Sequence, residues 1–229
     1  MSCPRWRCPI SGGNGGTEDG GEQLRFDHVI LAVGDLDAAA ERISGATGLG
    51  SVPGGRHAGL GTGNRIIPLG PDYIELMGIV DADEAAGSPL GRWVAERLAV
   101  GEGPAAFCLG TGDTEAVARR LKLSPEPMER IAPDGSSLGW RLAGLEATMT
   151  DPCKPFFIQW DVPPDSHPGR MVAPHQAPTH GISWVEVSGD SDVISTWIGA
   201  GALDVRIVPG DAGLVGFGVG TTDGELVLR

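Results

Sequence analysis

One pattern recurs three times along this chain of 229 residues: an apolar strand-like run, then an aspartate, then a short amphipathic stretch. The runs are rich in β-branched residues, which favour strands, and an aspartate before such a stretch is typical of a helix cap. Three further strand-like pieces, separated by turn-forming residues, follow each predicted helix. The repeat therefore predicts three β-α-β-β-β units. The runs are Phe26–Val33, Ala105–Leu109 and Ile182–Val187, and the aspartates are Asp35, Asp113 and Asp190.

A single β-α-β-β-β unit leaves a sheet edge and a sheet face uncovered, so we do not expect it to be stable alone. Two units joined edge to edge would form a curled mixed sheet with helices outside and a concave cup inside. The predicted fold class is therefore α+β, built from repeated modules. The third unit would dock elsewhere or pair across a homodimer. Chain order favours pairing of the first and second units, because consecutive elements are usually adjacent.

The predicted domain organisation has four parts. Residues 1–23 form a Gly-rich tail without periodic apolar residues, which we expect to be disordered and dispensable. The main domain, residues 24–165, contains the first two modules. The remaining boundaries are modules at 25–80 and 104–161, a Pro- and His-rich linker at 166–178, and a third module at 179–229.

Composition restricts the partners. Acidic residues outnumber basic ones by 30 to 17, and a net charge of −13 argues against nucleic acid or an anionic membrane as the main partner. No apolar run approaches the ~20 residues of a membrane-spanning helix, and no apolar stretch of a secretory signal follows the first arginines. The four cysteines are not spaced as a CxxC metal site. We therefore expect a reduced cytoplasmic protein that acts on a small molecule.

Strand alternation identifies two candidate site residues. The first strand has one face with His28, Ile30 and Ala32, and another with Val29, Leu31 and Val33. The second face is the better core against a helix, so His28 is predicted to point into the cup. Glu75 lies in the middle of an apolar strand, where a carboxylate is costly unless it is paired, solvated or bound to a metal.

Similar positions in the third unit hold His180 and Glu225. Two His–Glu pairs would form a 2-His-2-carboxylate set, which suits Zn, Ni, Mn or Fe(II). In the second unit, Ala106 takes the place of the histidine and Gln159 that of the glutamate. Ligand chemistry therefore favours pairing of the first and third units, whereas pairing of neighbours leaves a weak metal site that is better suited to hydrogen-bonding a ligand.

Three stretches of the sequence match a known family pattern: DHVILAVGDLDAAAERI, GGRHAGLGTGNRIIPLGPDYIEL and PFFIQWDVPPDSHPGR. Through them the chain resembles the glyoxalase-like branch of the vicinal oxygen chelate superfamily. The resemblance covers about residues 25–165 and implies paired β-α-β-β-β modules that form a cup. It also implies, as in many members, a divalent metal held by His and Glu from the first and last strands of each module.

The resemblance implies a metal-dependent lyase, isomerase or dioxygenase acting on a small oxygen-chelating substrate. A carboxylate, Glu75 or Glu225, would move the proton. Two histidines with one carboxylate would instead favour oxygen chemistry. The alternative is a metal-free protein that sequesters a hydrophobic or aromatic molecule against Trp and Met side chains. The expected metal ligands are His28, Glu75, His180 and Glu225, and the expected substrate contacts are His57, Asn64, Gln159 and Trp160.

Overall fold

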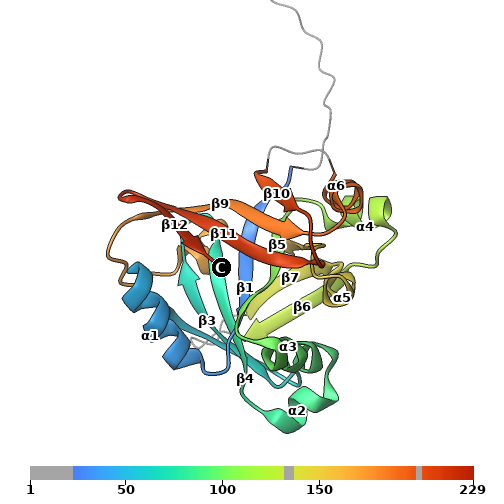
Figure 1. Ribbon diagram of the computed structural model, residues 1–229. Coiled ribbons are helices and arrows are strands. Elements are labelled where there is room, and N and C mark those ends of the chain that lie inside the picture. Colours follow the sequence, from blue (N-terminus) through green and yellow to red (C-terminus); the bar gives the residue numbers. More distant parts are fainter. Residues whose placement is uncertain (1–22, 132–136, 200–202) are drawn as a thin grey trace, which may run out of the picture.

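The computed structural model describes residues 23–131, 137–199 and 203–229. It contains an eight-stranded sheet, a four-stranded sheet and six α-helices within these residues (Figure 1). All but the last residue of the tail predicted at 1–23 lies outside the described residues. No helix in the described part of the chain is long and apolar enough to cross a membrane.

The first module begins with a strand and a capped helix. The Asp35 side chain accepts a hydrogen bond from the Ala38 backbone N–H at 2.9 Å, and Gly48 ends the helix with a φ of 74°. The cap predicted from the repeat is therefore confirmed. The elements are β1 (Arg25–Ala32), α1 (Leu36–Thr47), β2 (Val52–His57), β3 (Thr62–Pro68) and β4 (Tyr73–Ile79).

The second module repeats this order with one addition. Asp113 caps its first helix by accepting from the Ala116 backbone N–H at 2.9 Å. A short helix, α5 (Leu145–Thr150), is inserted before the last strand, and α2 (Ala82–Gly87) and α3 (Pro89–Val100) connect the two modules. The other elements are β5 (Gly103–Gly110), α4 (Thr114–Leu121), β6 (Glu126–Ile131), β7 (Ser137–Ala143) and β8 (Phe156–Trp160).

The first and second modules pair with each other. The strand order of the large sheet is β2-β3-β4-β1-β5-β8-β7-β6, with β1 and β5 antiparallel at its centre. Within each module the first strand runs parallel to the last, β1 beside β4 and β5 beside β8. This arrangement confirms the α+β class and the paired modules, and it selects neighbours over the first and third units.

The third unit has the predicted element order but a different strand pairing. Its sheet order is β10-β9-β11-β12, so its first strand runs parallel to the next strand and antiparallel to the one after. The chain returns from α6 directly beside β9, whereas the chain after α1 forms a hairpin with the following strand. The third unit thus keeps the predicted β-α-β-β-β order and forms a sheet of its own, with a strand pairing unlike that of the first two modules. Its elements are β9 (Thr179–Ser188), α6 (Ser191–Ile198), β10 (Val205–Val208), β11 (Gly213–Thr221) and β12 (Gly224–Leu228).

The large sheet has an outer and an inner face, and each carries its own core. The outer face packs against α1, α4 and the four-stranded sheet, which lies across it in Figure 1. The inner face packs against Trp93 and Val94 of α3. The predicted alternation of β1 is confirmed, because Val29 and Leu31 belong to the outer core and Ile30 and Ala32 to the inner one.

Candidate functional site

A buried polar cluster occupies the inner face of the first module. It contains Asp27 and His28 of β1, His57 of β2, Asn64 of β3 and Glu75 of β4. The exposed fractions are only 4% for His28, 6% for Glu75 and 7% for Asn64. Buried polar groups of this kind are costly unless they bind one another or a ligand.

Asp27 lies at one end of this cluster and contacts three side chains. Its Oδ1 lies 2.8 Å from His28 Nδ1, and its Oδ2 accepts from Trp160 Nε1 at 3.0 Å and lies 3.2 Å from His167 Nε2. His167 Nδ1 accepts from the Gly169 backbone N–H, so its Nε2 carries the proton that goes to Asp27. A carboxylate with no proton can only accept, so His28 Nδ1–H is also a donor. The lone pair of neutral His28 is therefore on Nε2.

The Asp27 carboxyl remains ionised inside the protein. Burial acts to raise its pKa, but hydrogen bonds from His167 and His28, together with the charge that these rings can carry, hold the pKa well below its ordinary value. Asp27 is therefore a fixed negative charge that accepts from His28 and orients its ring, as the carboxylate partner of a catalytic or metal-binding histidine does.

A β-bulge places Asp27 on the inner face. Simple alternation from Val29 would put Asp27 on the outer, apolar face, but the register of β1 against β5 shifts between Phe26 and His28. The extra residue turns two consecutive side chains toward the same site. Sequence reasoning missed Asp27 for this reason, and it missed His167 because nothing in the linker sequence identifies its partner.

Glu75 lies between the two histidines of the cluster. Asn64 Nδ2 donates to Glu75 Oε1 at 2.6 Å and lies 3.3 Å from His57 Nε2. Asn64 Oδ1 faces Gly54, where a Cβ atom would come within 2.1 Å of it, so this glycine makes room for the amide. The structure thus brings together four of the predicted residues, His28, His57, Asn64 and Glu75.

The histidine Nε2 atoms face the Glu75 carboxylate from two sides. His28 Nε2 lies 3.7 Å from Oε2, and His57 Nε2 lies 3.7 Å from Oε1. Because Asn64 Nδ2 can only donate, neutral His57 carries its proton on Nδ1, which lies 2.8 Å from Thr62 Oγ1. The Glu75 carboxylate therefore lies between the two Nε2 atoms, and that of His57 also accepts from Asn64 Nδ2.

Gln159 and Trp160 lie on opposite faces of β8. Gln159 Oε1 accepts from the backbone N–H and the hydroxyl of Thr114 at the start of α4, so it faces the outer side, away from Glu75. The expected equivalence of Gln159 and Glu75 is thus corrected. Trp160 lies on the inner side, where it contacts the cluster through Asp27.

His180 and Glu225 do not join the polar cluster. Both lie on the four-stranded sheet and are exposed, and Glu225 accepts from Ser183 Oγ at 2.7 Å. That sheet packs on the outer face, whereas His28 and Glu75 point to the inner one. The predicted four-ligand set is therefore split between two faces of the large sheet.

The second module is apolar at the corresponding places. Aligned on the helix-capping aspartates, Ala106 corresponds to His28 and Cys108 to Ile30. Ile30 pairs with Glu75, and Cys108 pairs with Phe156, so Phe156 takes the structural place of the glutamate. The second module thus supplies a methyl group and a phenyl ring where the first supplies an imidazole and a carboxylate.

Comparison with known proteins identifies the family. The sequence profile of the glyoxalase-like domain matches residues 26–199, most of the chain. This chain belongs to the glyoxalase-like domain family. A search of curated protein sequences found no match.

Several solved structures are similar to this chain. The crystal structure of a hypothetical protein from Staphylococcus aureus has 21% sequence identity and a TM-score of 0.58, covering 89% of this chain and 84% of that chain. A Streptomyces coelicolor methylmalonyl-CoA epimerase variant in complex with 2-nitronate-propionyl-CoA has 20% identity and a TM-score of 0.43, covering 59% and 95%. The epimerase from Mycobacterium tuberculosis has 20% identity and a TM-score of 0.42, covering 59% and 85%.

Two groups of side chains in this glyoxalase-like protein could be considered for a metal. Ligand atoms of Asp27, His28 and Cys108 all lie within 4.8 Å of one another. However, Asp27 already has three hydrogen-bonding partners, and burial, followed by the nearby charges of Asp27 and Glu75, raises the pKa of the Cys108 thiol well above its usual value. A thiol ligand must be deprotonated, so this group does not fit a metal.

The second group is the better set by its chemistry. His28, His57 and Glu75 offer two imidazoles and one carboxylate, the donor types that suit a divalent transition metal, and each Nε2 atom lies 3.7 Å from a Glu75 oxygen. Unlike those of the first group, these ligand atoms do not all lie within 4.8 Å of one another, so the side chains would have to close around an ion. The hydrogen bond from His28 to Asp27 is the outer contact that metal-binding histidines usually make. All three donors come from the first module of the glyoxalase-like domain.

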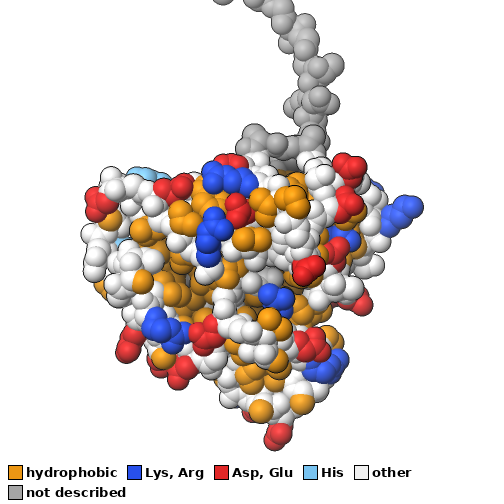
Figure 2. Space-filling model, in the orientation of Figure 1, with side chains coloured by type: hydrophobic (Ala, Val, Ile, Leu, Met, Phe, Trp, Pro, Cys, Tyr) orange, Lys and Arg blue, Asp and Glu red, His pale blue; other side chains and the backbone are white. Residues whose placement is uncertain are grey.

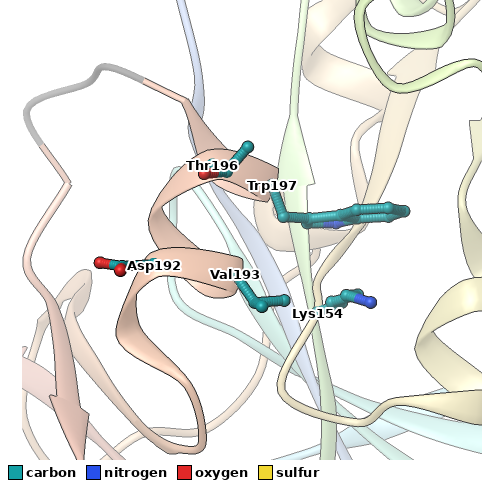
Figure 3. A pocket seen from close by; sticks show the side chains of 5 residues that line it. All are labelled: Lys154, Asp192, Val193, Thr196 and Trp197. Atoms are coloured by element: carbon teal, nitrogen blue, oxygen red, sulfur yellow. The ribbon is translucent and has the colours of Figure 1, made fainter.

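Surface features of the glyoxalase-like protein lie apart from this cluster. A pocket of about 390 Å³ beside α6 is lined by Lys154, Asp192, Val193, Thr196 and Trp197. Figure 3 shows Val193, Lys154 and the Trp197 ring on one side of α6, with Asp192 pointing the other way. Lys and Arg side chains on the face drawn in Figure 2 are scattered among acidic ones and form no continuous basic patch there.

Proposed function

We propose that the protein is a metal-dependent enzyme that acts on a small substrate with neighbouring oxygen atoms at His28, His57 and Glu75. One observation carries this proposal: both histidines engage Nδ1 elsewhere, and both Nε2 atoms lie 3.7 Å from the same buried carboxylate. A metal at this place would displace the hydrogen bond that Asn64 Nδ2 donates to His57 Nε2. Family membership supports the proposal, because the superfamily includes metalloenzymes.

Each side chain of the cluster has a distinct task in this proposal. Asp27 holds the His28 ring in one tautomer and orientation, and Asn64 holds one oxygen of Glu75. Glu75 is the carboxylate within reach of a substrate in the cluster, so it is the group that accepts and returns a proton. A bound divalent cation would polarise the substrate oxygens and lower the energy of a developing enolate.

Metal analysis tests the proposal directly. Purified protein is loaded with Zn²⁺, Mn²⁺ or Fe²⁺ and dialysed, and the metal that it retains is measured by inductively coupled plasma mass spectrometry. We expect about one equivalent per chain. The Glu75→Gln variant should lose it, and the matched Glu225→Gln variant, which changes an exposed carboxylate on the other sheet, should keep it. Equal metal content in the wild type and Glu75→Gln would refute the proposed site.

The donor set also bears on the reaction type. Two histidines with one carboxylate favour oxygen chemistry over isomerase or lyase chemistry. Uptake of dissolved oxygen by the Fe²⁺-loaded protein, with candidate substrates present, separates the two classes. Consumption of oxygen supports a dioxygenase, whereas solvent deuterium incorporation into a recovered substrate supports proton transfer alone. A cytoplasmic location and a homodimer stay predictions of the sequence.

A second candidate function is a metal-free protein that binds a small molecule. The apolar Ala106 and Phe156, at the places where the first module has His28 and Glu75, favour this alternative. It predicts no retained metal and a ligand affinity that does not change on treatment with a chelator. The metal analysis above therefore decides between the two functions.

A further inference from the structure

An aromatic surface continues from the polar cluster across the second module. Met128 of β6, Trp140 of β7 and Trp160 of β8 are direct cross-strand partners. They lie at the margin of the inner core and are only half-buried, unlike the fully buried side chains behind them. The rings of Trp140 and Trp160 have centroids 5.5 Å apart and are tilted by 45°. This surface, Met128–Trp140–Trp160, is named the aromatic shelf.

The shelf is connected directly to the polar cluster. Trp160 Nε1 donates to Asp27 Oδ2 at 3.0 Å, and the Phe156 ring packs edge-on against the His28 ring with centroids 5.3 Å apart. Because its indole N–H is already bonded, Trp160 presents only carbon surface beyond that bond. On the inner face, aromatic side chains of the second module are therefore in direct contact with the polar side chains of the first.

This arrangement fits the general design of small-molecule sites, in which a few polar groups fix one end of a ligand and apolar walls hold the rest. Aromatic rings and a Met thioether favour a flat, polarizable partner through stacking and sulfur–aromatic contacts. The first module would bind the oxygen-bearing end and the second module the body. Ala106 and Phe156, at the places where the first module has His28 and Glu75, make the inner face of the second module apolar, as such a body requires.

We propose that the substrate has an aromatic body, which packs on Met128, Trp140 and Trp160 while its oxygen-bearing end lies against His28, His57 and Glu75. The placement of the oxygen-bearing end rests on the function proposed above. The selectivity for an aromatic body rests only on the shelf. The two parts can therefore succeed or fail separately.

Two neutral probes with the same α-hydroxy-ketone end test the shelf: 2-hydroxyacetophenone, which has a phenyl ring, and hydroxyacetone, which has a methyl group. Their dissociation constants are measured by calorimetry on the full chain, with metal and after removal of metal. We expect 2-hydroxyacetophenone to bind at least about 10-fold more tightly, as expected for one stacked ring. In Trp140→Ala this ratio should fall toward one, whereas Trp140→Phe should keep most of it.

Control variants separate the possible outcomes. Met128→Ala tests the shelf through a second residue if Trp140→Ala does not fold, which thermal melting shows. Val193→Glu charges the pocket beside α6 and should leave the ratio unchanged, because that pocket lies on a different element. Equal affinities of the two probes for the wild type, or a ratio that depends on Val193 and not on Trp140, would overturn the inference. A Trp140-dependent ratio in a protein that retains no metal would preserve the shelf and reject the metal enzyme.

Discussion

The two modules of the eight-stranded sheet share a strand order and helix caps, but their inner faces have opposite chemistry. The first module carries His28, His57 and Glu75, and the second carries Ala106 and Phe156 at the corresponding places. Their outer faces are alike, because both pack apolar side chains against helices and the four-stranded sheet. The outer faces therefore specify the fold that the two modules share. On the inner face, the first module carries the polar groups of the proposed site, and the second carries apolar side chains that stabilise the core.

Substitutions at Phe156 and Glu75 should affect stability and metal binding separately. Phe156→Ala removes a buried ring from the inner core and should lower the free energy of unfolding by about 3–5 kcal/mol. Glu75→Gln removes a buried charge and should change stability by less than about 1 kcal/mol, while it abolishes metal binding. Chemical denaturation of both variants checks this. A Glu75→Gln variant as unstable as Phe156→Ala would show that the polar cluster is structural.

The connection before the last strand also differs between the modules, and in the first module it carries Asp72. Both Asp72 oxygens accept from the Ile182 backbone N–H at 3.0 Å, which ties this turn to β9 of the four-stranded sheet. Burial raises the pKa of Asp72 to about 7, partly offset by the hydrogen bond from Ile182 and reinforced by the charge of Asp27. The second module has α5 at this place.

The raised pKa of Asp72 gives a pH dependence with a definite sign. The folded state binds a proton that the unfolded chain has already lost between about pH 4 and pH 7, so stability falls as pH rises through this window. Asp72→Asn cannot titrate, so from pH 5 to pH 8 it should gain roughly 2–3 kcal/mol relative to the wild type. Denaturation curves at both pH values test this, and a constant difference would contradict the raised pKa.

Asp27 should affect ligand chemistry more than folding. In Asp27→Asn the amide can donate to His28 Nδ1, which moves the ring proton to Nε2 and removes the lone pair that faces Glu75. Metal affinity should fall by about 10- to 100-fold, the usual effect of losing such an outer contact. His167→Gln, which keeps a donor for Asp27, is the control and should bind metal almost normally. Calorimetric titration with Zn²⁺ measures both, and equal losses would mean that the linker segment, not the tautomer, is responsible.

Gln159 should give the smallest effect of the series. It supports the start of α4 through Thr114 and lies on the outer face, unlike Glu75. Gln159→Leu should therefore cost about 1 kcal/mol of stability, a typical value for lost hydrogen bonds, and leave metal and probe binding unchanged. Loss of probe binding in this variant would show that Gln159 contacts the ligand, as the sequence predicted.

Much of the fold could be predicted from the sequence because it depends on local, periodic signals. The helix caps at Asp35 and Asp113 and the inner direction of His28 follow from spacing and alternation. The pairing of neighbouring modules was favoured by chain order, whereas ligand chemistry favoured the first and third units. The strand order of the third unit could not, because the same order of elements allows either a hairpin or a parallel return after α6. That choice depends on packing against the outer face of the large sheet.

The candidate site was only partly visible in the sequence. Glu75 was a candidate because a carboxylate is costly in the middle of an apolar strand. His57 and Asn64 were candidates because the family resemblance marked their hairpin as a substrate contact, and the structure places all three in contact. Their roles stay predictions. Asp27 was hidden by a bulge that reverses its face, and His167 by a contact across more than a hundred residues. Neither a bulge nor a long-range contact changes the spacing of apolar residues, so neither could be predicted from the sequence.

In the proposed site, the first module alone supplies the polar groups that bind the ligand. Two matched histidine variants, His57→Ala and His180→Ala, test this assignment through their metal content after Zn²⁺ loading and dialysis. We expect about one Zn²⁺ per chain in the wild type and in His180→Ala, and a loss of metal in His57→Ala. Loss of metal in His180→Ala with retention in His57→Ala would refute the proposed site and place it on the four-stranded sheet.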